Sequence, residues 1–259
     1  MFETVRNAFK IKDLRKKIFY TFFALIVVRI GCQLPVPGVD ASVITDFFDS
    51  QKSLDFFNQL TGGSFSTMSI FALNITPYIT ASIIIQLLTI AIPKLEELHK
   101  DGEEGRKKLA EYTRYLTIAL SVIESAAMAI GFGQQGYLTD GVTFTSVAVF
   151  VVSLTAGSAF LMWLGEQITV KGVGNGISII LLINIVARIP SDLAGLYNTY
   201  IKGASNITNA LIAGVIIVAV IVAMYVFIVF LQDGERRIPV QYAKKIQGRK
   251  VAGGQSSHI

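Results

Sequence analysis

Long apolar stretches, separated by shorter polar and charged segments, alternate along this chain of 259 residues. A helix needs about 20 residues to cross the hydrocarbon core of a membrane, and the pattern predicts six such spans. They are residues 18–34, 70–92, 115–132, 144–164, 175–189 and 211–231. The first, third and fifth are short for a helix that faces lipid throughout. Short spans suit a bundle whose helix ends face a water-filled cavity.

The second expected span begins with polar residues where a lipid-facing helix would be apolar. The stretch NITPYITASIIIQ places Asn74, Thr76 and Pro77 in its first turn. Proline costs little there, because the first N–H groups of a helix have no intrahelical partners. Irregular backbone at membrane depth is tolerated where it is buried in protein or lines an aqueous cavity. We therefore expect this span to begin at the floor of an aqueous funnel.

The segment before this span is expected to lie outside the membrane and to contain a helix too short to cross it. Leu54, Phe57 and Leu60 recur at helical spacing. Gly62 and Gly63 then end the pattern and supply a hinge. An amphipathic external loop and a re-entrant helix that closes the channel both fit this pattern.

Two of the spans carry a face that changes from apolar to polar along the helix. Spacings of three and four residues put the members of each set on one face. The sets are Ile75, Ile79, Ser82 and Gln86 in the second span, and Ile177, Leu181, Asn184 and Arg188 in the fifth. If the two helices lie side by side, their aliphatic residues meet at mid-depth, with polar residues on either side. Such a ring excludes water and ions by dewetting, although ordinary packing gives the same spacing.

Composition and charge support a membrane protein with both termini in the cytoplasm. Charged residues make up 16% of the chain, against about 25% in soluble domains. Nineteen of the 23 Lys and Arg residues lie in segments 1–17, 93–114, 165–174 and 232–259. Six crossings put these segments on one side, which the positive-inside rule makes cytoplasmic. The basic N-terminal segment is expected to rest on anionic lipid.

The sequence also argues against several other functions. One cysteine, Cys32, excludes an internal disulfide framework. The two histidines, His99 and His258, lie in basic loops, so no intramembrane serine or metal enzyme is expected. No cofactor or metal site is predicted. A small-solute secondary transporter is the alternative, because transporters too use inverted repeats and broken helices.

Charged residues within or at the ends of the spans need partners. Arg29 is one candidate partner for Glu124, although a single sequence does not pair them. Glu166 is expected at the cytoplasmic interface, and Arg188 is expected to extend its charged end toward water.

Five longer motifs resemble the SecY family, the central subunit of the bacterial protein-translocation channel. They are VRIGCQLPVPGVD, FALNITPYITASIIIQLL, EGRKKLAEYTRYLT, FLMWLGEQITVKGVGNGISI and ERRIPVQYAKKIQGRK. The resemblance covers the chain from about residue 12 to its end. It implies an all-α polytopic membrane bundle that forms the first half of an inverted-repeat translocon fold, with a re-entrant plug helix.

This resemblance divides the chain into four parts. Residues 1–17 form a cytoplasmic amphipathic segment, and residues 18–190 form the first half-channel, with an external plug at about 54–67. Residues 191–231 hold an external loop and the sixth span. Residues 232–259 belong to a basic cytoplasmic loop in which the chain stops. The second span is expected to form one wall of the lateral gate through which signal sequences enter lipid.

The resemblance also implies three sets of site residues and no catalytic residues. The pore ring is Ile75, Ile79, Ile177 and Leu181. The plug includes Leu54, Phe57, Leu60, Gly62, Gly63 and Phe65. The residues that dock the ribosome and the SecA motor are Arg236, Arg237, Lys244, Lys245, Arg249 and Lys250.

The expected partners follow from the same family. They are SecE, SecG, the SecA motor, the ribosome through its RNA and protein, and a nascent polypeptide with a signal sequence. The expected location is the bacterial plasma membrane. For a chain that ends after the sixth span, a membrane insertase or chaperone is also expected, because its hydrated inner face would be exposed.

Overall fold

The computed structural model forms two compact units, Met1–Ser191 and Asp192–Ile259, and each is taken by itself. The structure describes residues 9–39, 55–139, 141–204, 206–235, 238–240, 245–247, 250–252 and 257–258. The predicted plug residue Leu54 and most of the predicted docking residues lie outside these ranges.

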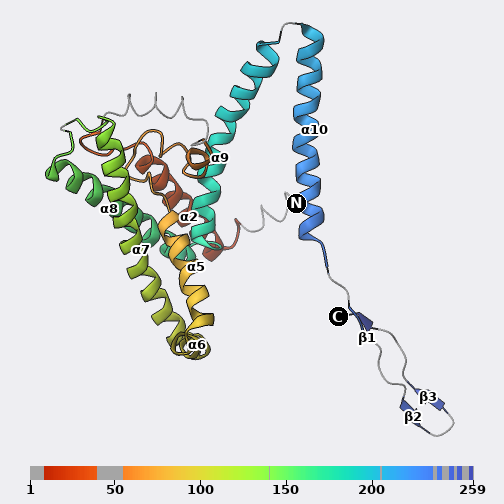
Figure 1. Cartoon of the computed structure of the whole chain (residues 1–259). Helices are drawn as coiled ribbons and strands as arrows, with labels where there is room; N and C mark the ends of the chain where they lie inside the picture. The colour runs from red at the N-terminus through yellow and green to blue at the C-terminus, as the bar shows by residue number, and fades with distance from the viewer. Residues whose placement is uncertain are drawn as a thin grey trace. The chain divides into compact units, whose positions relative to one another are not determined.

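Helices make up the first unit (Figure 1). They are α2 (Lys12–Gly31), α4 (Asp55–Leu60), α5 (Thr76–Ala91), α6 (Pro93–Lys100), α7 (Gly102–Gln134), α8 (Phe144–Lys171) and α9 (Gly176–Leu196), whose last turns belong to the second unit. The turns between α4 and α5 are not helical, and they connect the re-entrant segment to the second span.

The second unit contains two helices and four short strands. They are η2 (Tyr197–Lys202), which is a π-helix, α10 (Ile207–Gln232), β1 (Pro239–Val240), β2 (Lys245–Gln247), β3 (Lys250–Ala252) and β4 (Ser257–His258). Strand β1 pairs with β4, and β2 pairs with β3, both antiparallel. The expected all-α membrane bundle is therefore confirmed for the apolar part of the chain, and the strands are confined to its polar tail.

Four stretches of helix in the described ranges are long and apolar enough to cross a membrane, namely α7, α8, α9 with η2, and α10. The bent pair α5 and α6 gives a fifth. These correspond to the second to sixth predicted spans. Helix α2 holds the first predicted span but begins at Lys12, so its first turns carry the basic cluster before residue 18. That span therefore stays a prediction.

The helices extend well beyond the apolar stretches that predicted them. The expected loop 93–114 is helical, because α6 and the first turns of α7 fill it. Helix α8 continues to Lys171, and α9 passes through Pro190. Hydropathy marks where a helix meets hydrocarbon, whereas charged residues outside the membrane can still be helical. Ile92 precedes Pro93 and is extended, which produces the 103° bend between α5 and α6.

Two clusters of buried apolar residues hold the first unit together. One cluster joins α2, α5, α8 and α9 and contains Val28, Ile75 and Ile180. The other packs the turns before α5 against α7 and α8, with Met68 and Leu154 fully buried. The irregular turns before α5 therefore lie inside the helix bundle, where their polar groups need internal partners.

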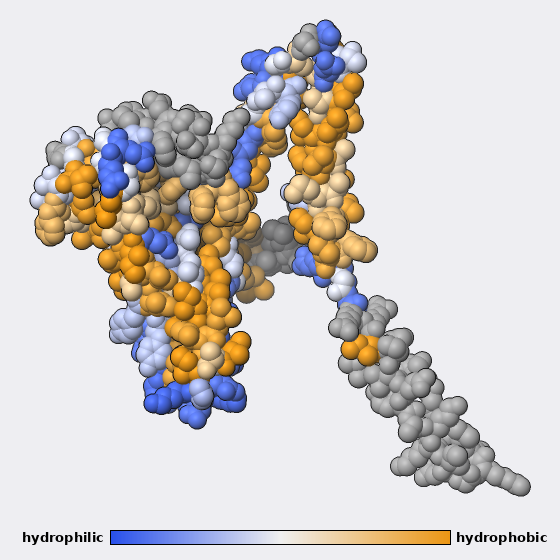
Figure 2. All heavy atoms as spheres, viewed as in Figure 1, coloured by the Kyte–Doolittle hydropathy of each residue, from blue (hydrophilic) through white to orange (hydrophobic). Residues whose placement is uncertain are grey.

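Apolar side chains cover much of the visible surface of α5 and of the later turns of α7, whereas hydrophilic residues gather around α6 and the first turns of α7 (Figure 2). In the second unit, α10 buries none of its residues and is apolar on all sides. A helix of this composition is suited to lipid or to an apolar partner.

We predict that substitution by alanine has opposite effects on the free energy of unfolding at two glycines of the bundle. A Cβ at Gly157 would lie 2.0 Å from the Ile70 carbonyl oxygen, so Gly157→Ala should lower the free energy of unfolding by about 1–3 kcal/mol. At Gly131, which has nothing within 4 Å, alanine should raise it by up to about 1 kcal/mol. Denaturant titration in detergent, followed by the fluorescence of the single tryptophan, Trp163, would measure both. Equal effects at the two sites would contradict the packing described above.

Candidate pore and plug site

The re-entrant segment turns back into the bundle at two glycines. Helix α4 ends at Leu60, and Gly62 and Gly63 follow with φ of +68° and +90°. Only glycine adopts this left-handed region without strain, so the two glycines form the turn that follows α4. Their use as a hinge stays a prediction. The Ser64 hydroxyl then donates to the Thr61 and Phe71 carbonyl oxygens at 2.8 and 3.1 Å. The segment is thereby folded onto the turns before α5.

The backbone at Gly62 lies directly against α9. A Cβ at this position would come within 3.0 Å of the Cα and carbonyl oxygen of Asn184 and 2.7 Å from Arg29 Nη1. At Gly63 a Cβ would lie 3.3 Å from Arg188 Nη1. Arg188 Nε is buried and has no hydrogen-bond partner among the described residues. The Arg188 side chain thus packs beside the plug. The sequence did not predict this contact, because Arg188 was expected to extend its charged end toward water.

Three polar side chains from three different elements meet at this contact, and we call Arg29, Asn74 and Asn184 the polar clasp. Asn74 Nδ2 donates to the Leu60 carbonyl oxygen at 3.0 Å. Asn184 Nδ2 donates to Asn74 Oδ1 at 3.1 Å. The clasp therefore links helix α9 and the start of α5 to the end of the plug helix.

The arginine of the polar clasp completes the connection. Arg29 Nη1 donates to Asn184 Oδ1 at 3.3 Å, and Nη2 donates to the Gly62 carbonyl oxygen at 3.4 Å. The candidate pairing of Arg29 with Glu124 is therefore wrong. Glu124 instead lines a mostly apolar cavity of about 350 Å³ beside Phe57 and Phe65.

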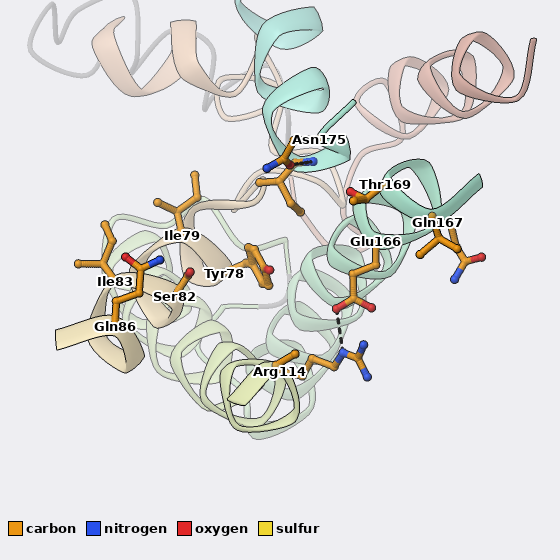
Figure 3. Close-up of a pocket in the computed structure, with 13 residues that line it drawn as sticks. Tyr78, Ile79, Ser82, Ile83, Gln86, Arg114, Glu166, Gln167, Thr169 and Asn175 are labelled. Atoms are coloured by element: carbon orange, nitrogen blue, oxygen red, sulfur yellow. Dashed lines mark hydrogen bonds and ion pairs between the residues drawn. The ribbon is translucent and has the colours of Figure 1, made fainter. Parts of the chain in front are cut away.

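A larger cavity is lined in part by the aliphatic and polar residues of α5. Its volume is about 570 Å³, and α5, α7, α8 and the start of α9 line it (Figure 3). Ile79, Ser82 and Gln86 face it from α5, as their spacing predicts, and Ile177 faces it from α9. The α5 stripe thus changes from apolar to polar along the wall of one cavity.

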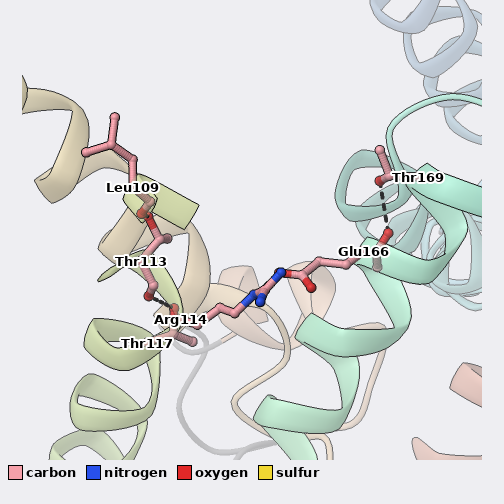
Figure 4. A network of polar contacts seen from close by, with 7 residues as sticks. Leu109, Thr113, Arg114, Thr117, Glu166 and Thr169 are labelled. Carbon is pink, nitrogen blue, oxygen red and sulfur yellow. Dashed lines mark hydrogen bonds and ion pairs between the residues drawn. The ribbon is translucent and has the colours of Figure 1, made fainter. Parts of the chain in front are cut away.

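An ion pair joins two walls of this cavity. Arg114 Nε on α7 lies 2.8 Å from Glu166 Oε1 on α8 (Figure 4). Thr113 and Thr117 donate to carbonyl oxygens one turn back in α7. The pair gives Glu166 the partner that it was expected to need, and both residues line the cavity.

Comparison with known proteins decides the family. A family model described as SecY matches residues 69–259. The protein translocase subunit SecY of Halalkalibacterium halodurans is 47% identical over 268 residues, which cover 100% of this chain and 61% of that relative. This chain belongs to the SecY family. It spans about 60% of the relative's length.

Solved channel structures share the fold. One is described as Sec61 in the canine ribosome-channel complex from the endoplasmic reticulum, with a TM-score of 0.56, 21% identity and coverage of 87% of this chain and 49% of that one. In another, the plug domain of SecY is said to stabilise the closed state and to maintain a membrane seal. Its TM-score is 0.56, with 20% identity and coverage of 94% and 52%. The alternative of a small-solute transporter is not supported by these matches.

The structure brings together three of the four residues expected in the SecY pore ring. Ile75 is fully buried, and Ile79 and Ile177 pack against the same cluster. Leu181 is half-buried and does not belong to either cluster of buried residues. Ile180, which the sequence did not single out, is fully buried in the cluster. Leu181 follows Ile180 in the same turn of α9. The helical spacing therefore pointed to the turn that packs against the cluster, but it did not identify Ile180 as the buried residue.

The predicted plug and docking residues differ in exposure, and several of them lie outside the described residues. Phe57 is exposed, Leu60 and Phe65 are half-buried, and Leu54 lies outside the described residues. Lys245 and Lys250 belong to the paired strands β2 and β3, of which only the backbone is described. The remaining docking residues, Arg236, Arg237, Lys244 and Arg249, lie outside the described ranges.

We predict that the plug backbone tolerates no side chain at its contact with α9. Gly62→Ala should lower the thermal unfolding midpoint in detergent more than Gly38→Ala does, by the equivalent of about 1 kcal/mol. Gly38 is a matched control, because its φ is +80° but nothing lies within 4 Å of an added Cβ. Both variants carry the strain of a left-handed alanine, so their difference isolates the packing. The same loss for both would show that Gly62 does not press on α9.

Proposed function

We propose that this chain is part of a protein-conducting channel that moves unfolded polypeptides across the bacterial plasma membrane. The observation that carries the proposal is the aliphatic cluster of Ile75, Ile79 and Ile177. Ile79 and Ile177 also line the larger cavity, and Ile75 directly follows Asn74, which donates a hydrogen bond to the Leu60 carbonyl group at the end of α4. A channel for small polar solutes would place hydrogen-bonding groups at this depth. The chain itself carries out no chemistry, and the SecA motor or translation supplies the force.

The aliphatic cluster would act as a seal that yields to a polypeptide. Bulky apolar side chains exclude water and ions from a narrow pore by dewetting. No covalent bond or ion pair holds Ile75, Ile79, Ile177 and Leu181 to one another, so a chain that enters can push them apart. The plug then blocks the pore when no polypeptide is present, as is said of the plug domain in the related SecY structure.

The second and third spans, α5 and α7, would contribute to lateral release. Both present apolar side chains on their outer surface (Figure 2). In the proposed channel, α5 forms one wall of the lateral gate, and a signal sequence passes between it and the other half of the channel into lipid. SecE and SecG would complete the assembly around the helices.

The basic tail is proposed to dock the ribosome and the SecA motor on the cytoplasmic side. Six Lys and Arg residues lie in the last 28 residues, 232–259. Ribosomal RNA is a polyanion, so contacts of this kind weaken as salt rises. The related Sec61 structure is described as part of a ribosome-channel complex, which favours the same use of the tail here. The proposed orientation therefore has both ends of the chain in the cytoplasm, with the N-terminal segment on anionic lipid.

We predict that a polypeptide arrested in the complete channel crosslinks to cysteines placed in the ring. Ile75→Cys, Ile79→Cys, Ile177→Cys and Leu181→Cys, each made with Cys32→Ser, should form disulfides with a cysteine in the arrested chain. Leu87→Cys is the control, because Leu87 is 61% exposed and lies about 100° round the helix from Gln86, off the face that carries Ile75 and Ile79. Equal crosslinking at Leu87 and at the ring positions would contradict a pore at the aliphatic cluster.

We predict that reversing two charges in the tail weakens docking without preventing membrane insertion. Arg236→Glu with Arg237→Glu should reduce ribosome affinity by about tenfold or more at low salt and reduce the salt dependence of binding. Co-sedimentation of ribosomes with channels in nanodiscs, at several salt concentrations, would measure both. The control Lys202→Glu changes a basic residue on the opposite side of the proposed membrane. Unchanged ribosome binding by the tail variant would remove these residues from the docking surface.

A further inference from the structure

Buried hydrogen bonds, in addition to apolar packing, hold the plug against the half-channel. The polar clasp of Arg29, Asn74 and Asn184 joins α2, the start of α5 and α9 to two carbonyl groups of the plug segment, those of Leu60 and Gly62. Asn74 and Asn184 are each only 1% exposed. Buried amides of this kind are costly unless every donor and acceptor is used.

The backbone of Asn74 shows that this position is specialised for the clasp. Its φ is +53°, in the left-handed region that glycine and asparagine adopt most readily. This conformation immediately precedes the first turn of α5 and Ile75, the fully buried residue of the expected ring. The side chain that contacts the plug and the side chain that seals the pore are therefore neighbours on one turn of backbone.

We propose that the polar clasp is a latch that sets how readily the plug leaves its site, and this inference rests on the channel function proposed above. When the plug moves, the Leu60 and Gly62 carbonyl groups lose their side-chain donors, and Asn184 loses a bonded partner if Asn74 follows. Water or the peptide groups of an entering polypeptide can then replace the lost hydrogen bonds. The free-energy cost of breaking the latch is therefore large when the pore is dry and small once water or a polypeptide occupies it.

The geometry makes Asn184 the central residue of the latch. It accepts from Arg29 through Oδ1 and donates to Asn74 through Nδ2, so one amide couples two helices. It is also the residue whose backbone lies closest to Gly62. Removal of its side chain breaks the hydrogen bonds that connect α9 to the plug through Arg29 and Asn74. The packing of Gly62 against α9 and the apolar cluster at Ile75 remain.

Hydrogen–deuterium exchange of the plug amides would test the latch directly. In the protein purified in nanodiscs, Asn184→Ala should speed exchange in peptide 58–69 by about five- to thirtyfold, because exchange reports local opening. Asn74→Gly should act similarly, since glycine keeps the positive φ and removes only the side chain. The double variant should add little to either single variant, because both break the same connection. Asn198→Ala, at an exposed site in η2, is the matched control.

The outcomes separate the latch from the channel function. Exchange in peptide 58–69 that stays at the wild-type rate in both single variants would overturn the latch, whether or not the channel transports polypeptides. Additive effects in the double variant would overturn the coupling of Asn74 to Asn184. In the complete channel in lipid vesicles, the same variants should raise the resting ion leak severalfold. Faster exchange without a leak would overturn the link between the latch and the seal, and transport assays on the wild type test the proposed function separately.

Discussion

The structure depends on a single constraint, which is that non-helical backbone buried at membrane depth must find its hydrogen-bond partners inside the protein. The turns between α4 and α5 meet it partly through backbone hydrogen bonds, such as that from the Ile70 N–H to the Leu34 carbonyl oxygen. Hydroxyl groups within the turns, such as that of Ser64, donate to further carbonyl groups. Side chains from other helices add to these, as Arg29 does for the Gly62 carbonyl group. Because these donors come from α2 and α9, satisfying the plug also fixes the helices that surround it.

The same constraint explains why polar and apolar residues lie so close together at the pore. Ile75 needs dry surroundings to seal, whereas Asn74 needs partners to be buried at all. The left-handed backbone of Asn74 reconciles the two, because it turns the chain between the end of the re-entrant segment and the first turn of α5. Asn74, which contacts the proposed plug, and Ile75, which belongs to the proposed seal, are thus consecutive residues of one segment.

Much of this arrangement could be predicted from the sequence, because period and polarity act locally. The 3.6-residue spacing placed Ile79, Ser82 and Gln86 on the wall of one cavity. The two glycines at 62 and 63 predicted the turn after α4, since their conformation is a property of the backbone itself. The ends of the helices were predicted less well, because charged helices outside the membrane carry no hydropathy signal, as α6 and the first turns of α7 show.

The polar clasp could not be predicted in this way, because its partners are far apart in the sequence. Arg29 and Asn184 are 155 positions apart, and Asn74 and Asn184 are 110 apart. A charge inside a span signals that a partner is needed but not which one, so Glu124 was the wrong choice for Arg29. The actual partners are the Asn184 side-chain oxygen and the Gly62 carbonyl group, and no residue type marks a backbone carbonyl group as a partner. Buried asparagines at the start of one span and in the middle of another were the usable signal, since an amide at membrane depth requires both a donor and an acceptor nearby.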